Sequence, residues 1–259
     1  MRYFILVLLM LTSTAQARSV FIEDLTWPEI RDAIAAGTDT AIYYAGSTEQ
    51  NGPHMATGKH NFIARHVAGS IALKLGKTLV YPIMPFAPTG DADRRTGHMA
   101  YPGSVSVSES NYTAVARDVA ASARAAGFRT ILIMADHGDG QTALAQLAET
   151  LNNQWKAGGT RVFYVGDLYV QYGQLESDLL AKLGLKAGGH AGLADTASLM
   201  AVDKDRRWIR PGAIPQAGKS AEVEGNSVAA SARLGRKLIN LKVETALRQI
   251  RALLTPVQP

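Results

Sequence analysis

Residues 130–155 read TILIMADHGDGQTALAQLAETLNNQW, and this stretch decides the fold class. Its first five residues, Thr130–Met134, form an apolar run of strand length. From Thr142 to Trp155 the large apolar side chains recur on one stripe, which is typical of an amphipathic helix. Between the two segments lies the polar run DHGDG at 136–140. The stretch therefore predicts a buried strand, a polar loop and a helix that packs back against a sheet.

The same alternation continues outward along the chain. Strand-like runs occupy Thr40–Ala45, Thr78–Met84 and Thr160–Val165. Further helix-like segments lie at 61–75, 112–126, 175–183, 195–201 and 227–254. Strands that alternate with helices favour a parallel sheet with helices on both faces. We therefore predict an α/β fold, a three-layer α/β/α sandwich with a mostly parallel sheet.

The beginning of the chain has the pattern of a secretory signal peptide. Met1-Arg2 is a short basic start, residues 3–11 are apolar, and Ala15-Gln16-Ala17 is a small-residue cleavage signature. The apolar run is shorter than the about 20 residues that a stable membrane anchor needs. A buried N-terminal helix or an uncleaved interfacial anchor is the alternative. We expect residues 1–17 to be removed and residues 18–259 to form one periplasmic or secreted domain that has no membrane contact.

The composition excludes several kinds of protein. The 259 residues include no cysteine, which rules out disulfides, thiolate zinc sites and iron–sulfur clusters. A metal site would have to use histidine, carboxylate and amide groups. The formal net charge is +5, and the basic residues are scattered apart from the stretch at 204–210. Nucleic-acid binding is therefore not expected, and a small molecule is the expected partner.

Polar residues follow two of the predicted strands at the ends where open parallel sheets bind ligands. The first cluster is GSTEQNGPH at 46–54, followed by His60; a glutamate such as Glu49 and a histidine are good ligands for zinc or manganese. The second contains His137 and Asp139 on a loop whose glycines allow close approach to an ion. The alternative for both clusters is a turn with solvated histidines and a capping carboxylate.

Two more segments complete the candidate site. His190 lies between glycines in GGHAGLAD at 188–195. Its imidazole can exchange a proton near neutral pH, which makes it a candidate for acid–base catalysis; a surface or capping histidine is the alternative. Residues 91–103, DADRRTGHMAYPG, are expected to form a long loop that is either functional or an irregular part of the surface.

Together these motifs resemble those of the creatininase family. GSTEQNGPH resembles the family signature G-S-x-E-Q-H-G-P-H, and YPGSVS at 101–106 is similar to the family segment F-P-G-T-x-S. DHGD at 136–139 falls where the family has its second metal-ligand segment, and HAGLADT at 190–196 is similar to H-A-G-x-x-E-T. Order and spacing agree from about Ala41 to Met200, which is most of the chain.

The resemblance implies an α/β/α sandwich that hydrolyses an amide or cyclic amide with a metal-activated water, often at a two-metal site of zinc or manganese. It also implies a homo-oligomer, commonly a hexamer. By position, Glu49 and His137 match ligands of the first metal, and Asp139 matches an acidic ligand of the second. His190 matches a histidine that is implicated in proton transfer.

Two positions depart from the family pattern. Asn51 stands where a second-metal histidine is expected, and His60 stands where the family has an aspartate that bridges the two ions. A neutral amide oxygen is a poor zinc ligand, and an imidazole offers one nitrogen to one metal. We therefore predict one tightly bound zinc or manganese ion, with a second ion possible. The expected ligands are Glu49, His60 and His137, with Asp139 as a fourth ligand or as a group that orients water.

These residues predict an exported metal-dependent hydrolase that cleaves a C–N bond of a small amide or cyclic amide. Asp139 or His190 would move protons between water and the leaving nitrogen. Lys59 would add positive charge in place of a second ion. Two alternatives stay open: a hydrolase that acts on a lactone or a short peptide, and a non-catalytic periplasmic protein that binds a small molecule in the same fold.

Overall fold

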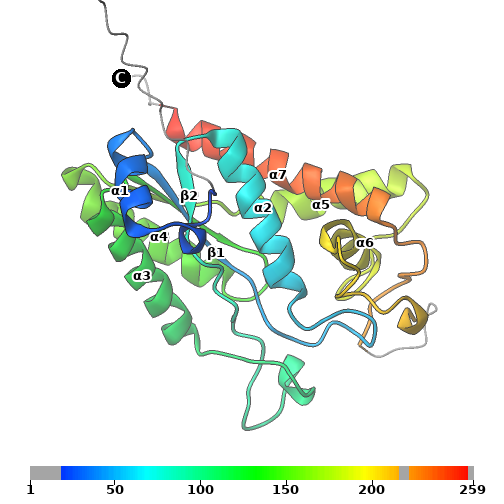
Figure 1. Cartoon of the computed structure of the whole chain (residues 1–259). Coiled ribbons are helices and arrows are strands. Elements are labelled where there is room, and N and C mark those ends of the chain that lie inside the picture. Colours follow the sequence, from blue (N-terminus) through cyan, green and yellow to red (C-terminus); the bar gives the residue numbers. More distant parts are fainter. Residues whose placement is uncertain (1–18, 216–221, 256–259) are drawn as a thin grey trace, which may run out of the picture.

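The computed structural model describes residues 19–215 and 222–255, so the predicted signal peptide at 1–17 lies outside the described residues. Within them, four strands form one parallel sheet in the order β2-β1-β3-β4. The strands are β1 (Thr40–Ala45), β2 (Thr78–Val80), β3 (Thr130–Ala135) and β4 (Arg161–Tyr164). Helices cover both faces of the sheet (Figure 1), which confirms the three-layer α/β/α prediction.

Alternate residues of the strands face opposite sides and build two separate cores. Ile42 and Leu132 belong to the first core, whereas Tyr43 and Ile131 belong to the second. The helices of the first core are α2 (Lys59–Leu75), α6 (Leu193–Val202) and α7 (Ala232–Leu254). The helices of the second core are α1 (Trp27–Ala35), α3 (Glu109–Ala126) and α4 (Gln141–Trp155). A further helix, α5 (Val170–Lys182), packs against α7.

The two central strands end side by side. β1 and β3 pair in register from Thr40 opposite Thr130 to Ala45 opposite Ala135. The loops that follow them therefore leave the sheet at the same edge, which is where parallel sheets bind ligands. A Cβ at Gly46 would lie 2.1 Å from Oδ1 of Asn61, so only glycine lets the loop after β1 pass this close to the start of α2. The sequence clusters after β1 and β3 are thereby brought together.

Several element boundaries differ from the sequence expectations. The strand expected at 78–84 ends at Val80 in the structure. Pro82 follows shortly after this end, and a proline has no N–H to donate to a neighbouring strand. The last helix begins at Ala232 rather than at Ser227. Helix α1 was not predicted, although Thr26 and Glu29 form a capping box at its start.

Among the described residues, none of the helices combines the length and the hydrophobicity that crossing a membrane requires.

Candidate metal centre and active-site cavity

Glu49 is the centre of the candidate site, and its side chain is fully buried. Oε2 accepts a hydrogen bond from the Ser47 hydroxyl at 2.6 Å and lies 2.9 Å from Nε2 of His137. Oε1 lies 3.2 Å from Nε2 of His60. Burial raises the pKa of Glu49, but the hydrogen bonds with His137 and His60 outweigh it and hold the pKa well below its usual range. The carboxyl group is therefore ionised at neutral pH.

Both ring nitrogens of His60 face carboxylates. Nδ1 lies 2.8 Å from Oδ2 of Asp136, and Nε2 faces Oε1 of Glu49. A carboxylate only accepts, so with Nδ1–H donated to Asp136, Nε2 either donates a second ring proton to Glu49 or gives its lone pair to a metal ion. Burial and the charge of Lys59 lower the pKa of His60, but the hydrogen bonds with Asp136 and Glu49 outweigh them and raise it. A cation, either a second ring proton or a metal ion, has to lie between the two facing acceptor atoms.

Asp136 is itself held by a buried cation. Nζ of Lys242 donates to Oδ1 of Asp136 at 2.6 Å, and the Tyr44 hydroxyl lies 3.3 Å from the same oxygen. Burial raises the pKa of Asp136, but Lys242 and His60 outweigh it and hold the pKa well below its usual range. Asp136 therefore stays ionised and fixes the orientation and tautomer of His60, as carboxylate partners of metal-binding histidines do.

The inner group of Glu49, His60 and His137 fits a zinc or manganese ion. Its three ligand atoms lie within 4.8 Å of one another, and all three residues are buried. One carboxylate and two imidazoles are a common ligand set for these metals. The main-chain N–H of Asp139 donates to Nδ1 of His137 at 3.1 Å and orients this ring. The proton that His137 then carries on Nε2 would be exchanged for the ion.

An outer group shares the same carboxylate. Nε2 of His98 and Nδ1 of His190 lie 3.7 and 3.8 Å from Oε1 of Glu49. The three ligand atoms also lie within 4.8 Å of one another, but the two histidines are only partly buried. The longer distances and the greater exposure make this group a weaker metal site than the inner group, and a second ion would bind here.

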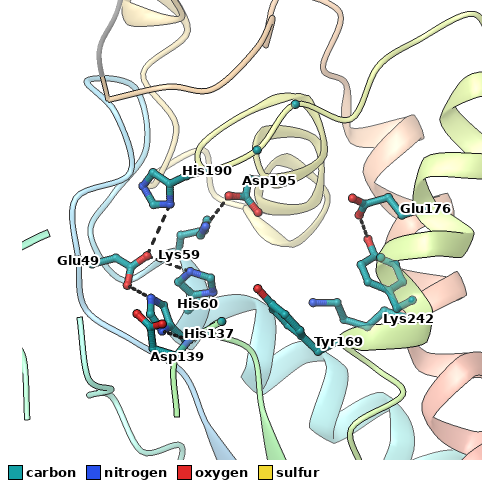
Figure 2. A pocket seen from close by; sticks show the side chains of 15 residues that line it. Glu49, Lys59, His60, His137, Asp139, Tyr169, Glu176, His190, Asp195 and Lys242 are labelled. Atoms are coloured by element: carbon teal, nitrogen blue, oxygen red, sulfur yellow. Dashed lines mark hydrogen bonds and ion pairs between the residues drawn. The ribbon is translucent and has the colours of Figure 1, made fainter. Parts of the chain in front are cut away.

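His190 is oriented as a proton acceptor. Its Nε2 lies 2.9 Å from the main-chain oxygen of Gln50, which can only accept, so Nε2 carries the proton. Nδ1 therefore points its lone pair toward the centre (Figure 2). Burial and the charge of Lys59 lower the pKa of His190 to about 4. The imidazole is neutral at neutral pH and is free to take a proton. Ala191 beside it has a φ of 55°, a conformation that is strained for alanine.

A cavity of about 420 Å³ opens beside the centre. Figure 2 shows Glu49, His60 and His137 on one side of it and Glu176 on the other. Lys59 lines the cavity next to the centre, is 1% exposed and donates to Oδ2 of Asp195 at 2.6 Å. None of the described residues that line the cavity has an aliphatic side chain. The cavity is therefore suited to a polar ligand.

Two residues singled out from the sequence, Asp139 and Asn51, are not part of the inner group. Asp139 lines the cavity, but its carboxylate lies outside both metal-binding groups. Its role as a ligand or as a water-orienting group stays a prediction. Asn51 is buried, and its Nδ2 donates to the main-chain oxygen of Glu49 at 2.9 Å. Asn51 thus shapes the loop that carries Glu49.

Three functional residues were not singled out from the sequence. His98 lies in the loop at 91–103, which was expected to be either functional or irregular, and the loop brings this histidine to Glu49. Asp136 stands next to His137 in the polar loop at 136–140, but it was not among the expected ligands or proton-transfer groups. Lys242 gives no signal in the sequence, because a lysine in an amphipathic helix usually lies on the solvated face.

A buried Glu–His–His group at the carboxyl ends of the strands of a parallel sheet is an arrangement that metal-dependent hydrolases use. The family model described as creatininase, creatinine amidohydrolase, matches residues 23–250. The chain therefore belongs to the creatininase family, as the sequence motifs predicted.

Relatives and solved structures agree with this membership. The chain is 22% identical to creatinine amidohydrolase of Pseudomonas putida over 196 residues, which are 73% of this chain and 74% of that protein. It is 30% identical to 3-dehydro-scyllo-inosose hydrolase of Thermotoga maritima over 120 residues, which are 46% of this chain but only 36% of that protein.

A manganese form of creatininase has the same fold, with a TM-score of 0.72 at 20% identity over 92% of this chain and 100% of that chain. A creatininase variant described as a Zn-Zn type gives a TM-score of 0.76 at 19% identity with the same coverage. Solved creatininases thus exist in zinc and manganese forms, and this chain has a Glu/His group able to bind such an ion.

Proposed function

We propose that this chain is an exported metal-dependent hydrolase that cleaves the C–N bond of a small amide or cyclic amide. The observation that carries the proposal is the buried group of Glu49, His60 and His137, which opens onto a polar cavity of about 420 Å³. Membership of the creatininase family supports the reaction type. The relative from Pseudomonas putida is named creatinine amidohydrolase, which agrees with this reaction type.

The inner group would hold a zinc or manganese ion. When bound, such an ion supplies Lewis acidity, which polarises a carbonyl and makes water more acidic. His190 faces the same carboxylate with a free lone pair on Nδ1, so it can accept a proton from water and return it to the leaving nitrogen. Asp139 lines the cavity close to His137 and is a second candidate for proton transfer.

Lys59 would stabilise negative charge on the substrate. Its ammonium group makes one hydrogen bond, to Asp195, among the described residues. Two N–H groups therefore remain for an oxygen that becomes negative during the reaction, and such donors are most effective where water is excluded. Lys59 also lowers the pKa of His190 after the effect of burial, which keeps that imidazole neutral.

We further propose that one ion per chain is bound tightly. His60 offers only Nε2, because Nδ1 is committed to Asp136. Asn51 offers a second ion only a neutral amide oxygen, which is a poor ligand for zinc. A second ion would depend on His98 and His190, whose distances from Glu49 are longer.

A second candidate function is hydrolysis of a polyhydroxylated cyclic ketone. The relative from Thermotoga maritima is named for such a substrate and is 30% identical over the matched segment. The absence of aliphatic side chains among the described residues that line the cavity agrees with a hydroxylated ligand as well.

The proposed reaction is tested with a panel of cyclic amides, linear amides, lactones, short peptides and cyclitol ketones, assayed with zinc and with manganese. Metal-dependent release of an amine or ammonia that disappears in Glu49→Ala and His137→Ala supports an amidohydrolase. Turnover of the ketones alone would replace it by the second candidate. Tight ligand binding without turnover of any compound would contradict an enzyme and favour a binding protein.

Export and assembly are also proposals. The N-terminal pattern supports export to the periplasm or the medium, and N-terminal sequencing of the protein from a secreting host tests cleavage after Ala17. The family resemblance supports a homo-oligomer, possibly a hexamer. Light scattering on the purified protein tests the oligomer, and a monomeric mass would contradict it.

A further inference from the structure

The wall of the cavity opposite the metal centre has a distinct chemistry. Figure 2 shows Glu176 there, with Tyr169 and Lys242 between it and the centre. Tyr172 and Glu176 belong to α5, and Lys242 belongs to α7. Glu176 is separate from the proposed metal ligands, so it is available to recognise the part of a substrate that does not react.

Both lysines of the cavity already have a carboxylate partner. Lys242 is bound to Asp136 at 2.6 Å, and Lys59 is bound to Asp195 at 2.6 Å. Each lysine thus has a carboxylate within hydrogen-bond distance, and among the described residues neither makes an ion pair with Glu176.

Glu176 is the acidic group of this wall that lacks such a partner. Among the described residues it makes no ion pair, and the hydrogen bond it has is donated by the Tyr172 hydroxyl to Oε2. Tyr172 thus fixes one oxygen of the carboxyl group and leaves Oε1 without a donor from the described residues. Burial raises the pKa of Glu176, and the hydrogen bond from Tyr172 and the charge of Lys242 offset this only in part.

A partly buried carboxylate without a counter-ion costs free energy in the empty protein. A ligand that brings a positive charge to Oε1 recovers this cost, whereas an alkyl group does not. Of the other carboxylates among the described residues that line the cavity, Asp195 is occupied by Lys59, and Glu49 and Asp139 lie on the side of the metal centre (Figure 2).

We propose that Glu176 is a specificity-determining residue that binds an ammonium group of the substrate across the cavity from the metal centre. This inference rests on the proposed function for the identity of the reacting group, since the reacting carbonyl has to lie at Glu49, His60 and His137. The substrate class is then a small amide that carries a positively charged nitrogen at a distance from the bond that is cleaved.

Matched series of simple amides test this recognition. The probes are ω-amino carboxamides of increasing chain length, with ω-hydroxy and n-alkyl carboxamides of equal length as comparisons. Calorimetry on the wild-type protein should show one length at which the amino amide binds about tenfold or more tightly than the alkyl amide, the size expected for an ionic hydrogen bond. Equal binding of amino and alkyl amides at every length would overturn the proposal.

Glu176→Gln separates charge from hydrogen bonding. The amide oxygen of glutamine still accepts from a hydroxyl, so binding of the hydroxy amide should change little while the preference for the amino amide disappears. A variant that keeps the preference would overturn the proposal. Best binding of the hydroxy amide by the wild type would overturn it too and would favour a polyhydroxylated substrate. Glu149→Gln, on the exposed side of α4, is the matched control and should behave as the wild type.

The same titrations on zinc-loaded and chelator-treated protein keep the two proposals apart. If the chain proves to bind no metal and to hydrolyse nothing, the preference for the amino amide still tests Glu176 by itself. If zinc and turnover are present but the preference is absent from both forms, the inference about Glu176 fails and the proposed hydrolase stands.

Discussion

Nδ1 of His60 and Oδ2 of Asp136 lie 2.8 Å apart in the protein interior, and this contact decides which nitrogen of the imidazole is available. It turns Nε2 toward Glu49, and it links the metal centre to the buried cation Lys242 on α7. Through Lys242 and Asp136, helix α7 thus supports the proposed metal ligand His60 on α2.

Replacing Asp136 should weaken metal binding without removing a ligand. In Asp136→Asn the tautomer of His60 is no longer fixed, and loss of such a partner typically costs about 10–100-fold in metal affinity. Competition with a chelating dye measures the zinc affinity. Lys242 loses its counter-ion as well, so the double variant Asp136→Asn with Lys242→Met separates the effect on folding. Tyr44→Phe, which removes the more distant partner of Asp136, is the control, and an unchanged zinc affinity in Asp136→Asn would contradict the account.

Lys59→Met should lower turnover but not the zinc content. Removal of a donor that stabilises developing negative charge typically lowers kcat by about 10²–10³-fold. Steady-state kinetics and elemental analysis measure the two quantities. Asp195 is left without its cation, so Lys59→Met with Asp195→Asn is the companion variant that restores charge balance. Wild-type kcat in this pair of variants would show that Lys59 has only a structural role.

His190→Gln distinguishes proton transfer from metal binding. If His190 moves protons, kcat should fall by about 10²–10⁴-fold while the zinc content stays unchanged. Loss of zinc from this variant would instead place His190 among the tight ligands. His66, exposed on α2, provides the control substitution His66→Gln, which should leave both quantities at the wild-type level.

Glu176 should make the stability of the protein depend on pH. Burial raises the pKa of Glu176 above its unfolded value, so the folded state binds this proton more tightly. The contribution is fully present below the unfolded pKa, about 4.3, and is lost as pH rises through the folded pKa. Glu176→Gln should therefore be more stable than the wild type at neutral pH, and the difference should shrink on acidification.

Urea unfolding at neutral and at acidic pH measures this difference, with Glu149→Gln as the control. A Glu176→Gln variant that is less stable than the wild type at neutral pH would mean that the carboxylate has a counter-ion. If the protein becomes more stable when the charge of Glu176 is removed, this charge lowers the stability of the folded state. Residues that bind a ligand commonly have this effect, because they are selected for binding and not for stability.

The fold and part of the site were predictable because they follow from local patterns. β1 and β3 are short apolar runs, and their polar loops begin where the runs end, so Glu49 and His137 were placed correctly at one edge of a parallel sheet. His60 joins them because α2 starts directly after the first loop. Hydrophobic periodicity and strand ends are properties of the sequence itself.

The opposite wall of the cavity was not predictable from the same patterns. Lys242 and Glu176 occupy amphipathic helices, where a charged residue normally faces water. Their burial depends on how α5 and α7 pack against each other and against the sheet, which no short stretch of sequence specifies. His98 likewise reaches Glu49 only through the path of an irregular loop.

Elemental analysis of zinc in wild-type and Glu49→Ala protein, after removal of loosely bound metal, shows whether Glu49 holds a metal ion. We expect one tightly bound ion per chain in the wild type and its loss in Glu49→Ala, with a lower unfolding temperature for the metal-free forms. An absence of zinc and manganese from the wild type, or full retention in Glu49→Ala, would contradict the metal centre. Two firmly bound ions per chain would contradict the single-ion site.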